Sequence, residues 1–181
     1  MIEIRRILCP IDFSEFSRQA LDHAAAIANW YQSTIIVFNV CPLVPAAVFA
    51  PAAPMMPAIV PSPEDLTAVR SSMKRFAEAK AGSSASFQYE IGEGDAATEI
   101  LERSRAISSD LIVLGTHGRS GFERLVLGSV AEKVLRRATC PVLTVPRRTS
   151  DPVPAAPPFK RIVCAIDFSD CSTAGLTYAL S

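Results

Sequence analysis

The 181-residue sequence has no excess of either charge, because 18 Lys and Arg balance 18 Asp and Glu. Nucleic-acid-binding domains usually carry a basic surplus, so this balance argues against that class of protein. It also removes the long-range repulsion that would keep identical subunits apart. A long apolar run is missing too: the weakly polar stretch 40–63 is broken by prolines and cannot form a membrane-spanning helix.

Cysteines are too few and too irregular to form a recognisable framework. The five are not arranged in any CxxC pair, which is a spacing that metal sites and redox motifs use. Cys9, Cys140 and Cys164 lie in or beside apolar runs, where cysteine packs as a small hydrophobic side chain. We therefore expect reduced thiols. The charged start of the chain does not match a secretory signal, and we expect a cytosolic protein.

Short apolar segments alternate with helical patterns between residues 5 and 145. The spacing of apolar residues predicts helices between these segments, one of them over 95–107. Phe87, Tyr89 and Ile91 alternate with polar residues, so we expect this segment to be a half-exposed strand at a sheet edge. The strands are predicted at 7–11, 34–40, 87–91, 110–115 and 141–145.

This alternation is typical of an α/β fold with an open parallel sheet and helices on both faces. Right-handed crossovers and buried central strands leave few orders for five strands. The order 3-2-1-4-5 places the half-exposed third strand at an edge and the first and fourth strands in the middle. Ligands bind such sheets where the strand order reverses, here between the first and fourth strands. A Pro-, Ala- and Met-rich loop over 41–63 interrupts the pattern, and long loops of this kind are often functional or mobile.

A second copy of the first strand region occurs late in the sequence. Lys160 to Ser169 matches Arg5 to Ser14 at an offset of 155 residues, and Ile-Asp-Phe-Ser occurs in both. A strand and the start of a helix cannot bury a core by themselves. We therefore expect a domain over 1–146, a Pro-rich linker over 147–158 and the start of an incomplete second repeat over 159–181.

The region between the predicted fourth strand and the next helix carries the clearest signal of a binding site. Gly115 ends the strand, so main-chain N–H groups there can approach a ligand without a Cβ in the way. Gly128 and Ser129 open a helix, whose free N–H groups and dipole favour an anion. Asp12 follows the first strand on the other side and can accept hydrogen bonds from ribose hydroxyls. Together these residues favour a nucleotide site.

Each feature also has an explanation that needs no ligand. Ser129 and Glu132 match a capping box, which would satisfy the helix start internally. Asp12 can cap the first helix, and each glycine can serve a turn. Only two histidines occur. We expect His23 on the surface or in a subunit contact, whereas His117 lies in the glycine loop, where a phosphate or solvent contact and a catalytic role stay open.

The glycine pattern resembles that of the universal stress protein family. The aspartate at the end of the family's first strand matches Asp12, and residues 128–145 are similar to the family's most recognisable segment. The resemblance covers residues 5–145 and restarts in the second copy. ATP-binding members of the family carry G-2x-G-9x-G-(S/T), and the sequence has this pattern intact as Gly115, Gly118, Gly128 and Ser129.

The resemblance implies a fold of the adenine nucleotide alpha hydrolase-like type and bound ATP, with or without Mg²⁺, or else AMP or cyclic AMP. It implies adenine near the ends of the first two strands, ribose on Asp12 and Gly115, and phosphates along the glycine loop and the helix start. Arg119 would offset phosphate charge. The resemblance also implies a homodimer formed through the last strand, Cys140–Val145. The residues implied to bind the nucleotide are Pro10, Ile11, Asp12, Val40, Leu114, Gly115, Gly118, Arg119, Gly128, Ser129 and Val130.

Three hypotheses for the function follow. The first is a regulatory module whose nucleotide occupancy alters its partner contacts. The second is a slow ATPase or self-phosphorylating enzyme with Ser120 or Ser129 as acceptor, and slow because no P-loop lysine and no positioned nucleophile or base are visible. The absence of an S-G-G-x-D pattern after the first strand weakens a pyrophosphate-releasing synthetase of similar fold. The third is an assembly protein with an empty site.

Overall fold

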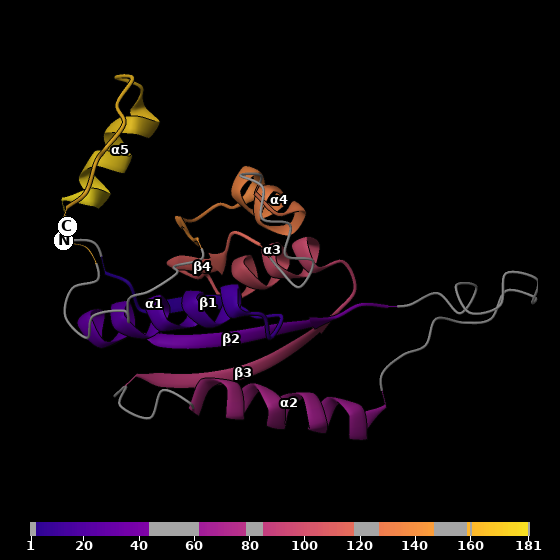
Figure 1. Ribbon diagram of the computed structural model, residues 1–181. Helices are drawn as coiled ribbons and strands as arrows, with labels where there is room; N and C mark the ends of the chain where they lie inside the picture. The colour runs from indigo at the N-terminus through magenta and orange to yellow at the C-terminus, as the bar shows by residue number, and fades with distance from the viewer. Residues whose placement is uncertain are drawn as a thin grey trace, which may run out of the picture.

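The structure, a computed structural model, describes residues 3–43, 62–78, 85–117, 127–146, 159 and 161–180. In these residues one five-stranded sheet carries helices on both faces (Figure 1). The strands are β1 (Arg6–Pro10), β2 (Thr34–Cys41), β3 (Ser86–Glu93), β4 (Leu111–Gly115) and β5 (Val142–Val145). The helices are α1 (Glu15–Tyr31), α2 (Pro63–Glu78), α3 (Ala96–Ala106), α4 (Ser129–Arg137) and α5 (Asp170–Ala179). Most of the predicted 41–63 loop and the 147–158 linker lie outside the described residues.

The sheet has the order β3-β2-β1-β4-β5, and its pairings are all parallel. The predicted α/β fold and strand order are therefore confirmed. β1 lies between β2 and β4, with Ile7 opposite Ile35 on one side and opposite Leu111 on the other. The strand order reverses between β1 and β4, which is where sheets of this kind bind ligands.

The central strand β1 is buried on both faces of the sheet. Ile7, Leu8 and Cys9 are each 0% exposed. Ile7 and Cys9 pack in a core cluster with residues of α1 and α2, whereas Leu8 packs on the opposite face with residues of α3 and α4. Successive side chains of a strand point to opposite faces. A strand covered on both sides therefore needs the continuous apolar run seen in the sequence.

The edge strand β3 has two unequal faces. Phe87, Tyr89 and Ile91 are partly buried against the core cluster that includes α1 and α2, while Ser86 and Gln88 are exposed. This confirms the prediction of a half-exposed strand at a sheet edge. The alternation of polar and apolar residues arises because α2 covers one face of β3 and leaves part of the other face open to water.

Side-chain caps set the starts of α1 and α3. The Ser14 hydroxyl precedes α1 and accepts a hydrogen bond of 3.2 Å from the main-chain N–H of Ser17. The Asp95 carboxylate precedes α3 and accepts a bond of 3.0 Å from the N–H of Thr98. Both residue types are preferred at this position, and the bonds from Thr98 lower the pKa of Asp95 below its ordinary value. The predicted helix over 95–107 is confirmed, with its two end residues acting as caps.

The prediction that His23 lies on the surface or in a subunit contact is wrong. Its side chain is only 6% exposed on α1. Nδ1 lies 2.9 Å from the main-chain carbonyl oxygen of Gln19, so this nitrogen donates there. The ring stacks on Phe159, with centroids 6.3 Å apart. The burial of His23 therefore involves a residue far along the chain, which the local helical pattern could not show.

All five cysteines are free thiols. Cys9 is buried in the central strand, and this burial strongly raises the pKa of its thiol. Cys9 therefore behaves as a small core residue rather than a nucleophile. Cys171, on the first turn of α5, is exposed. Among the helices in the described part of the chain, none is long and apolar enough to cross a membrane.

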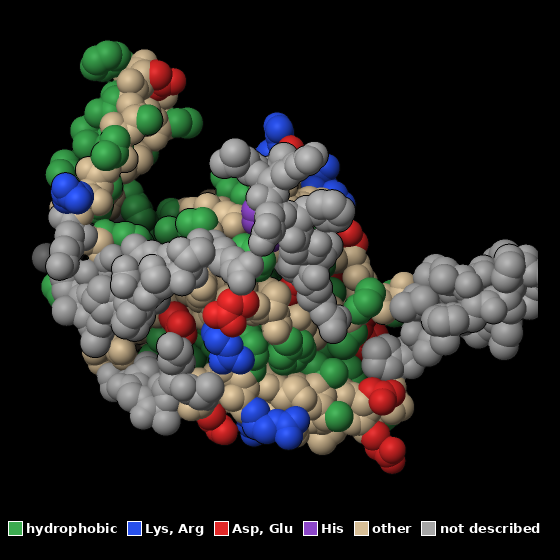
Figure 2. All heavy atoms as spheres, viewed as in Figure 1, with side chains coloured by type: hydrophobic (Ala, Val, Ile, Leu, Met, Phe, Trp, Pro, Cys, Tyr) green, Lys and Arg blue, Asp and Glu red, His purple; other side chains and the backbone are tan. Residues whose placement is uncertain are grey.

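Residues 161–180, here called the C-terminal unit, stand apart from the sheet in Figure 1. The strand expected at the start of this unit is not formed, because 161–167 has no neighbouring strand among the described residues. Figure 2 shows hydrophobic side chains along the unit, where Val163 is 97% and Phe168 is 93% exposed. The division into a domain, a linker and a second repeat stays a prediction.

The C-terminal unit contacts the domain through the last turn of α5. Tyr178 packs against the core cluster around α1. Burial raises the pKa of the Tyr178 hydroxyl to about 12, with smaller contributions from Tyr31, Cys140 and Asp110. Asp110 and Cys140 precede β4 and β5, and Tyr31 ends α1. The contact therefore lies at the amino ends of the strands, on the side of the sheet away from their carboxyl ends.

Candidate functional site

The carboxyl ends of β1 and β4 lie in adjacent strands, and the start of α4 is attached beside them. The N–H of Thr116 continues the ladder beyond Gly115 by donating to the carbonyl of Val145 at 3.1 Å. The N–H of Gly128 donates to the carbonyl of Thr116 at 2.7 Å, which fixes the start of α4 against the end of β4. We call this region, together with Asp12 after β1, the switch-point edge.

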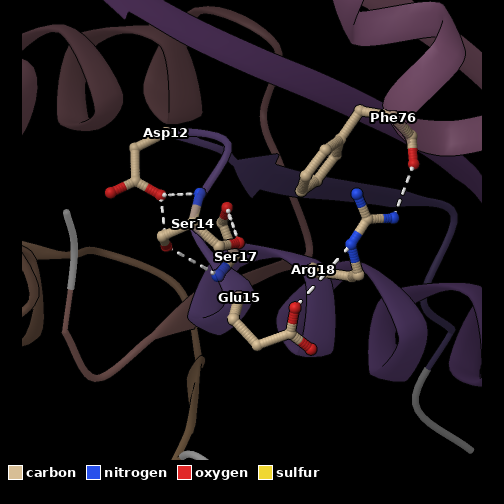
Figure 3. A network of polar contacts seen from close by, with 6 residues as sticks. All are labelled: Asp12, Ser14, Glu15, Ser17, Arg18 and Phe76. Atoms are coloured by element: carbon tan, nitrogen blue, oxygen red, sulfur yellow. Dashed lines mark hydrogen bonds and ion pairs between the residues drawn. The ribbon is translucent and has the colours of Figure 1, made fainter. Parts of the chain in front are cut away.

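Asp12 is held by one of its two carboxylate oxygens. Its Oδ1 accepts bonds from the main-chain N–H of Ser14 at 3.0 Å and from the Ser14 hydroxyl at 2.5 Å. In Figure 3 the other oxygen points away from these bonds. The N-cap of α1 is Ser14 rather than Asp12, so Asp12 supports the cap and keeps Oδ2 available as an acceptor.

An aromatic contact fixes the turn that follows Asp12. Phe13 has a φ of 64°, in the left-handed region that costs a residue other than glycine about 1–2 kcal/mol. Its ring meets the ring of Phe76 on α2 edge to face, with centroids 5.6 Å apart. The Arg18 guanidinium lies 4.1 Å from the centroid of Phe76 (Figure 3). These contacts join the turn to α2 and help to offset the backbone strain.

Gly115 is required by packing between two elements of the fold. A Cβ at this position would lie 2.8 Å from the Cβ of Phe16 and 2.9 Å from its carbonyl carbon. These distances are well inside van der Waals contact, and main-chain atoms cannot move aside as a flexible side chain does. In the described residues, the missing side chain of Gly115 therefore makes room for the first turn of α1. The sequence had indicated room for a ligand instead.

Helix α4 begins without a side-chain cap. Gly128 is the N-cap residue and Ser129 is the first residue of the helix, so no side chain bonds to the first N–H groups from the cap position. The predicted capping box of Ser129 and Glu132 is therefore wrong, because the helix begins one residue too early for it. A Cβ on Gly128 would lie 3.0 Å from the carbonyl oxygen of Thr116. This close approach favours glycine, and the uncapped N–H groups favour an acceptor.

His117 lies between the end of β4 and the start of α1. Its Nδ1 is 3.0 Å from the hydroxyl oxygen of Thr116, and its ring centroid is 5.2 Å from that of Phe16. Its Nε2 is buried and has no hydrogen-bond partner among the described residues. The sequence left the role of His117 open, and the structure adds it to the switch-point edge.

A buried asparagine that sequence reasoning missed holds the ends of β1 and β2 together. Asn39 is 8% exposed, and its Nδ2 donates to the carbonyl of Ile11 at 2.8 Å. The N–H of Ile11 donates in turn to the carbonyl of Phe38 at 2.8 Å. In the sequence, this role could have been inferred from the position of an asparagine inside the apolar run 34–40. Asn39 fixes the main chain that leads from β1 to Asp12.

The predicted site residues divide into four groups. Ile11 and Leu114 are each 4% exposed, so a ligand could reach them only through main-chain atoms. Gly118 and Arg119 lie outside the described residues. Pro10 and Val40 are half-buried at the ends of β1 and β2. The structure brings the others together at the switch-point edge: Asp12, Gly115, Gly128, Ser129 and Val130.

A surface hollow of about 440 Å³ lies elsewhere, beside β3 and α3. Its lining includes Phe38, Gly92 and Glu99. Glu90 and Arg103 in its wall form an ion pair with each other, so these two charges are already matched. We place the candidate site at the switch-point edge, because helix N–H groups without a side-chain cap and a carboxylate oxygen turned away from its own bonds are found there.

Residues 3–146 match the model of the universal stress protein family. Among curated relatives, universal stress protein MJ0531 of Methanocaldococcus jannaschii is 36% identical over 143 residues, which cover 78% of this chain and 81% of that protein. Universal stress protein YxiE of Bacillus subtilis is 31% identical over 149 residues, which cover 77% and 97%. The matched segment spans the whole sheet and the switch-point edge.

Solved structures share the fold at lower identity. Universal stress protein UspA from Lactobacillus plantarum is 22% identical with a TM-score of 0.64, covering 80% of this chain and 99% of that one. A universal stress protein in complex with cAMP is 23% identical, with a TM-score of 0.56 and coverages of 80% and 98%. The universal stress protein from Archaeoglobus fulgidus in complex with dAMP is 18% identical, with a TM-score of 0.52 and coverages of 80% and 98%. The family match and the curated relatives show that this chain belongs to the universal stress protein family.

Proposed function

We propose that this protein binds an adenine nucleotide at the switch-point edge and that occupancy of the site regulates its contacts with partners. The observation that carries the proposal is the start of α4, which has no side-chain cap and lies beside the end of β4. Helix N–H groups of this kind bind phosphate readily. The complexes of two fold neighbours with cAMP and dAMP support the adenosine part of the ligand.

The adenosine and the phosphates of the ligand would contact different groups of the protein. Oδ2 of Asp12 can accept hydrogen bonds from ribose hydroxyls, because Oδ1 alone is engaged by Ser14. The main chain at Pro10, Ile11 and Val40 would border the adenine. The phosphates would lie along Gly128, Ser129 and Val130, and the same proposal assigns Gly118 and Arg119 to them.

ATP, with or without Mg²⁺, is the nucleotide that we propose, and AMP and cyclic AMP are the alternatives to be compared with it. Phosphoryl transfer depends on positioned groups around the reacting phosphate, and the switch-point edge offers mainly main-chain donors. We therefore propose binding as the principal activity, with hydrolysis at most slow. Pairing of Cys140–Val145 between two copies is the proposed route to a homodimer, and a cytosolic location completes the proposal.

Calorimetric titration with ATP, AMP and adenosine tests the site when one main-chain N–H at the start of α4 is removed. Ser129→Pro removes an N–H from the first position of α4, where proline is tolerated. The preceding Gly128 has a ψ of 149°, which suits a residue before proline. Loss of one charge-assisted hydrogen bond should weaken ATP binding about tenfold.

Ala96→Pro is the matched control, because it makes the same change at the first position of α3, after Asp95 with a ψ of 120°. The control should leave ATP binding unchanged. Asp12→Asn should weaken the binding of all three ligands, since they share the ribose. If the folded protein, free of carried-over nucleotide, binds none of them, the proposed function is wrong.

A further inference from the structure

The hollow beside β3 and α3 is reached by side chains from both helical layers. It lies at β3, which is two strands away from β1 in the sheet and so away from the switch point. α2 and α3 cover opposite faces of the sheet (Figure 1). Arg70 of α2 and Glu99 and Glu102 of α3 nevertheless line this one hollow. Its volume of about 440 Å³ is in the range of pockets that bind small molecules.

The floor of the hollow is apolar and depends on a glycine. A Cβ on Gly92 would lie 2.7 Å from Cζ of Phe38 and 3.0 Å from Oε2 of Glu99. A side chain at this position would therefore occupy the space between the aromatic ring and the carboxylate. Ile91 and Ala106 add apolar surface to the lining. The missing side chain of Gly92 thus leaves an opening with a ring edge at its base and a carboxylate at its side.

Several charged side chains in the wall are not matched by a neighbour of opposite charge. Glu90 and Arg103 form an ion pair with each other. In the described part of the chain, Arg70, Glu99 and Glu102 form no ion pair. Glu99 is half-buried, so water solvates its carboxylate less completely than that of an exposed side chain. Opposite charges from α2 and α3 therefore face the same hollow without contacting each other.

The charges of the wall indicate the chemistry of a ligand. A guanidinium binds a carboxylate through two parallel hydrogen bonds, and a carboxylate accepts hydrogen bonds from ammonium groups. Glu99 and Glu102 are three residues apart on α3, which makes their side chains neighbours on the helix surface. Two carboxylates and one guanidinium match a ligand with two ammonium groups and one carboxylate. An α-amino acid with a cationic side chain, such as lysine, has these groups, and its methylene chain suits the apolar floor.

We infer that the hollow beside β3 binds a free basic α-amino acid at a site separate from the nucleotide site. Arg70 binds the α-carboxylate, and Glu99 and Glu102 bind the two ammonium groups. Gly92 leaves the floor open for the aliphatic part of the ligand. A lysine side chain within a protein has no free α-carboxylate for Arg70, so the free amino acid is the better match. This inference goes beyond the proposed function and does not depend on it.

Amide NMR of the full chain, titrated with lysine and two analogues, tests the inference. Norleucine lacks the side-chain ammonium group, and cadaverine lacks the α-carboxylate. Lysine should shift amide resonances of β3 and of the first turns of α3, and should leave that of Gly128 at the switch-point edge unchanged. Each analogue should bind about three- to tenfold more weakly than lysine, because it loses one charged contact.

Two exposed arginines of α2 provide a variant and a matched control. Arg70→Gln should weaken the binding of lysine and norleucine about three- to tenfold and leave cadaverine within about twofold, because cadaverine has no carboxylate. Arg75→Gln changes a neighbouring exposed arginine that is not part of the lining, and it should leave the binding of all three ligands unchanged.

Three results would overturn the inference. They are the absence of lysine-induced shifts in β3 and α3 of the folded protein, equal binding of cadaverine and lysine, and unchanged lysine binding in Arg70→Gln. Titration of the same samples with ATP keeps the two sites apart, since Arg70→Gln should bind ATP as the unmodified protein does. Loss of ATP binding in the unmodified protein would overturn the proposed function and leave the amino-acid site standing.

Discussion

The first strand and helix of the domain and the C-terminal unit have similar sequences, and they differ in what surrounds them. Phe13 and Phe168 have φ values of 64° and 65°. Ser14 and Ser169 each accept a hydrogen bond of 3.2 Å from the N–H three residues later. Asp12 and Asp167 each accept a bond of 3.0 Å from the serine two residues later. The turn and the cap are therefore properties of the local sequence.

The strands before these turns behave differently. Ile7 and Leu8 are 0% exposed, and β1 is paired on both sides. Their equivalents Ile162 and Val163 are 60% and 97% exposed, in a segment that forms no strand. The comparison shows that a strand of this sequence needs neighbouring strands, as expected when β-propensity reflects the packing of a buried surface.

The largest expected effect comes from shortening the equivalent apolar residues. Leu8→Ala should lower the free energy of unfolding by about 2–5 kcal/mol, because it leaves a cavity in a close-packed core. Val163→Ala should change it by no more than about 0.5 kcal/mol, because the side chain is exposed. Denaturant unfolding of the full chain measures both. A large effect of Val163→Ala would show that the C-terminal unit is buried against something in solution.

Replacing a glycine by alanine should have opposite effects on stability in the two regions. Gly115→Ala should destabilise the protein by about 1–3 kcal/mol, because the new Cβ would overlap main-chain atoms of Phe16. Gly175 lies inside α5 with nothing within 4 Å of a Cβ, and the equivalent residue of α1 is Ala20. Gly175→Ala should therefore raise the helix content of α5, by about 0.5–1 kcal/mol of helix stability. Circular dichroism and thermal unfolding test both; loss of helix in Gly175→Ala would contradict the comparison.

The smallest effect concerns the contact between the two regions. Burial raises the pKa of Tyr178 to about 12 from its ordinary value of 10.0, so the neutral hydroxyl is the form that packs against the domain. The contact is fully stable below about pH 10 and is lost as the pH rises through about 12. Burial also raises the pKa of Tyr89, so tyrosinate absorbance followed against pH should show a step near pH 12 that belongs to Tyr178. Tyr178→Phe should remove that step, and its persistence would assign the late titration to another residue.

The helices, the strands and the strand order were predictable because they depend on the spacing of apolar residues that are close together in the sequence. The continuous apolar run at Ile7–Ile11 indicates a strand covered on both faces, and the alternation at Phe87–Ile91 indicates a strand covered on one face. Two glycines of the predicted pattern lie beside the point where the strand order reverses, because Gly115 ends β4 and Gly128 precedes α4. Local sequence was sufficient wherever the structure is made of near neighbours.

The unpredicted features all depend on residues that are distant in sequence or on a shift of one position. His23 is buried with help from Phe159, and Gly115 is needed because of Phe16. The capping box failed because α4 begins at Ser129, so that Gly128 takes the cap position. Tertiary contacts decide at which residue a helix begins. Here the contact is the hydrogen bond from the N–H of Gly128 to the carbonyl of Thr116.

The hydrogen bonds that continue beyond the strands have a consequence for the dynamics of the switch-point edge. The amides of Ile11, Thr116 and Gly128 all donate to main-chain carbonyls although they lie outside β1, β4 and α4. Slow hydrogen exchange should therefore extend past the formal ends of these elements. The edge is organised before a ligand arrives, so little conformational entropy is lost at these amides on binding. Slow steps in ligand exchange would then have to arise elsewhere in the chain.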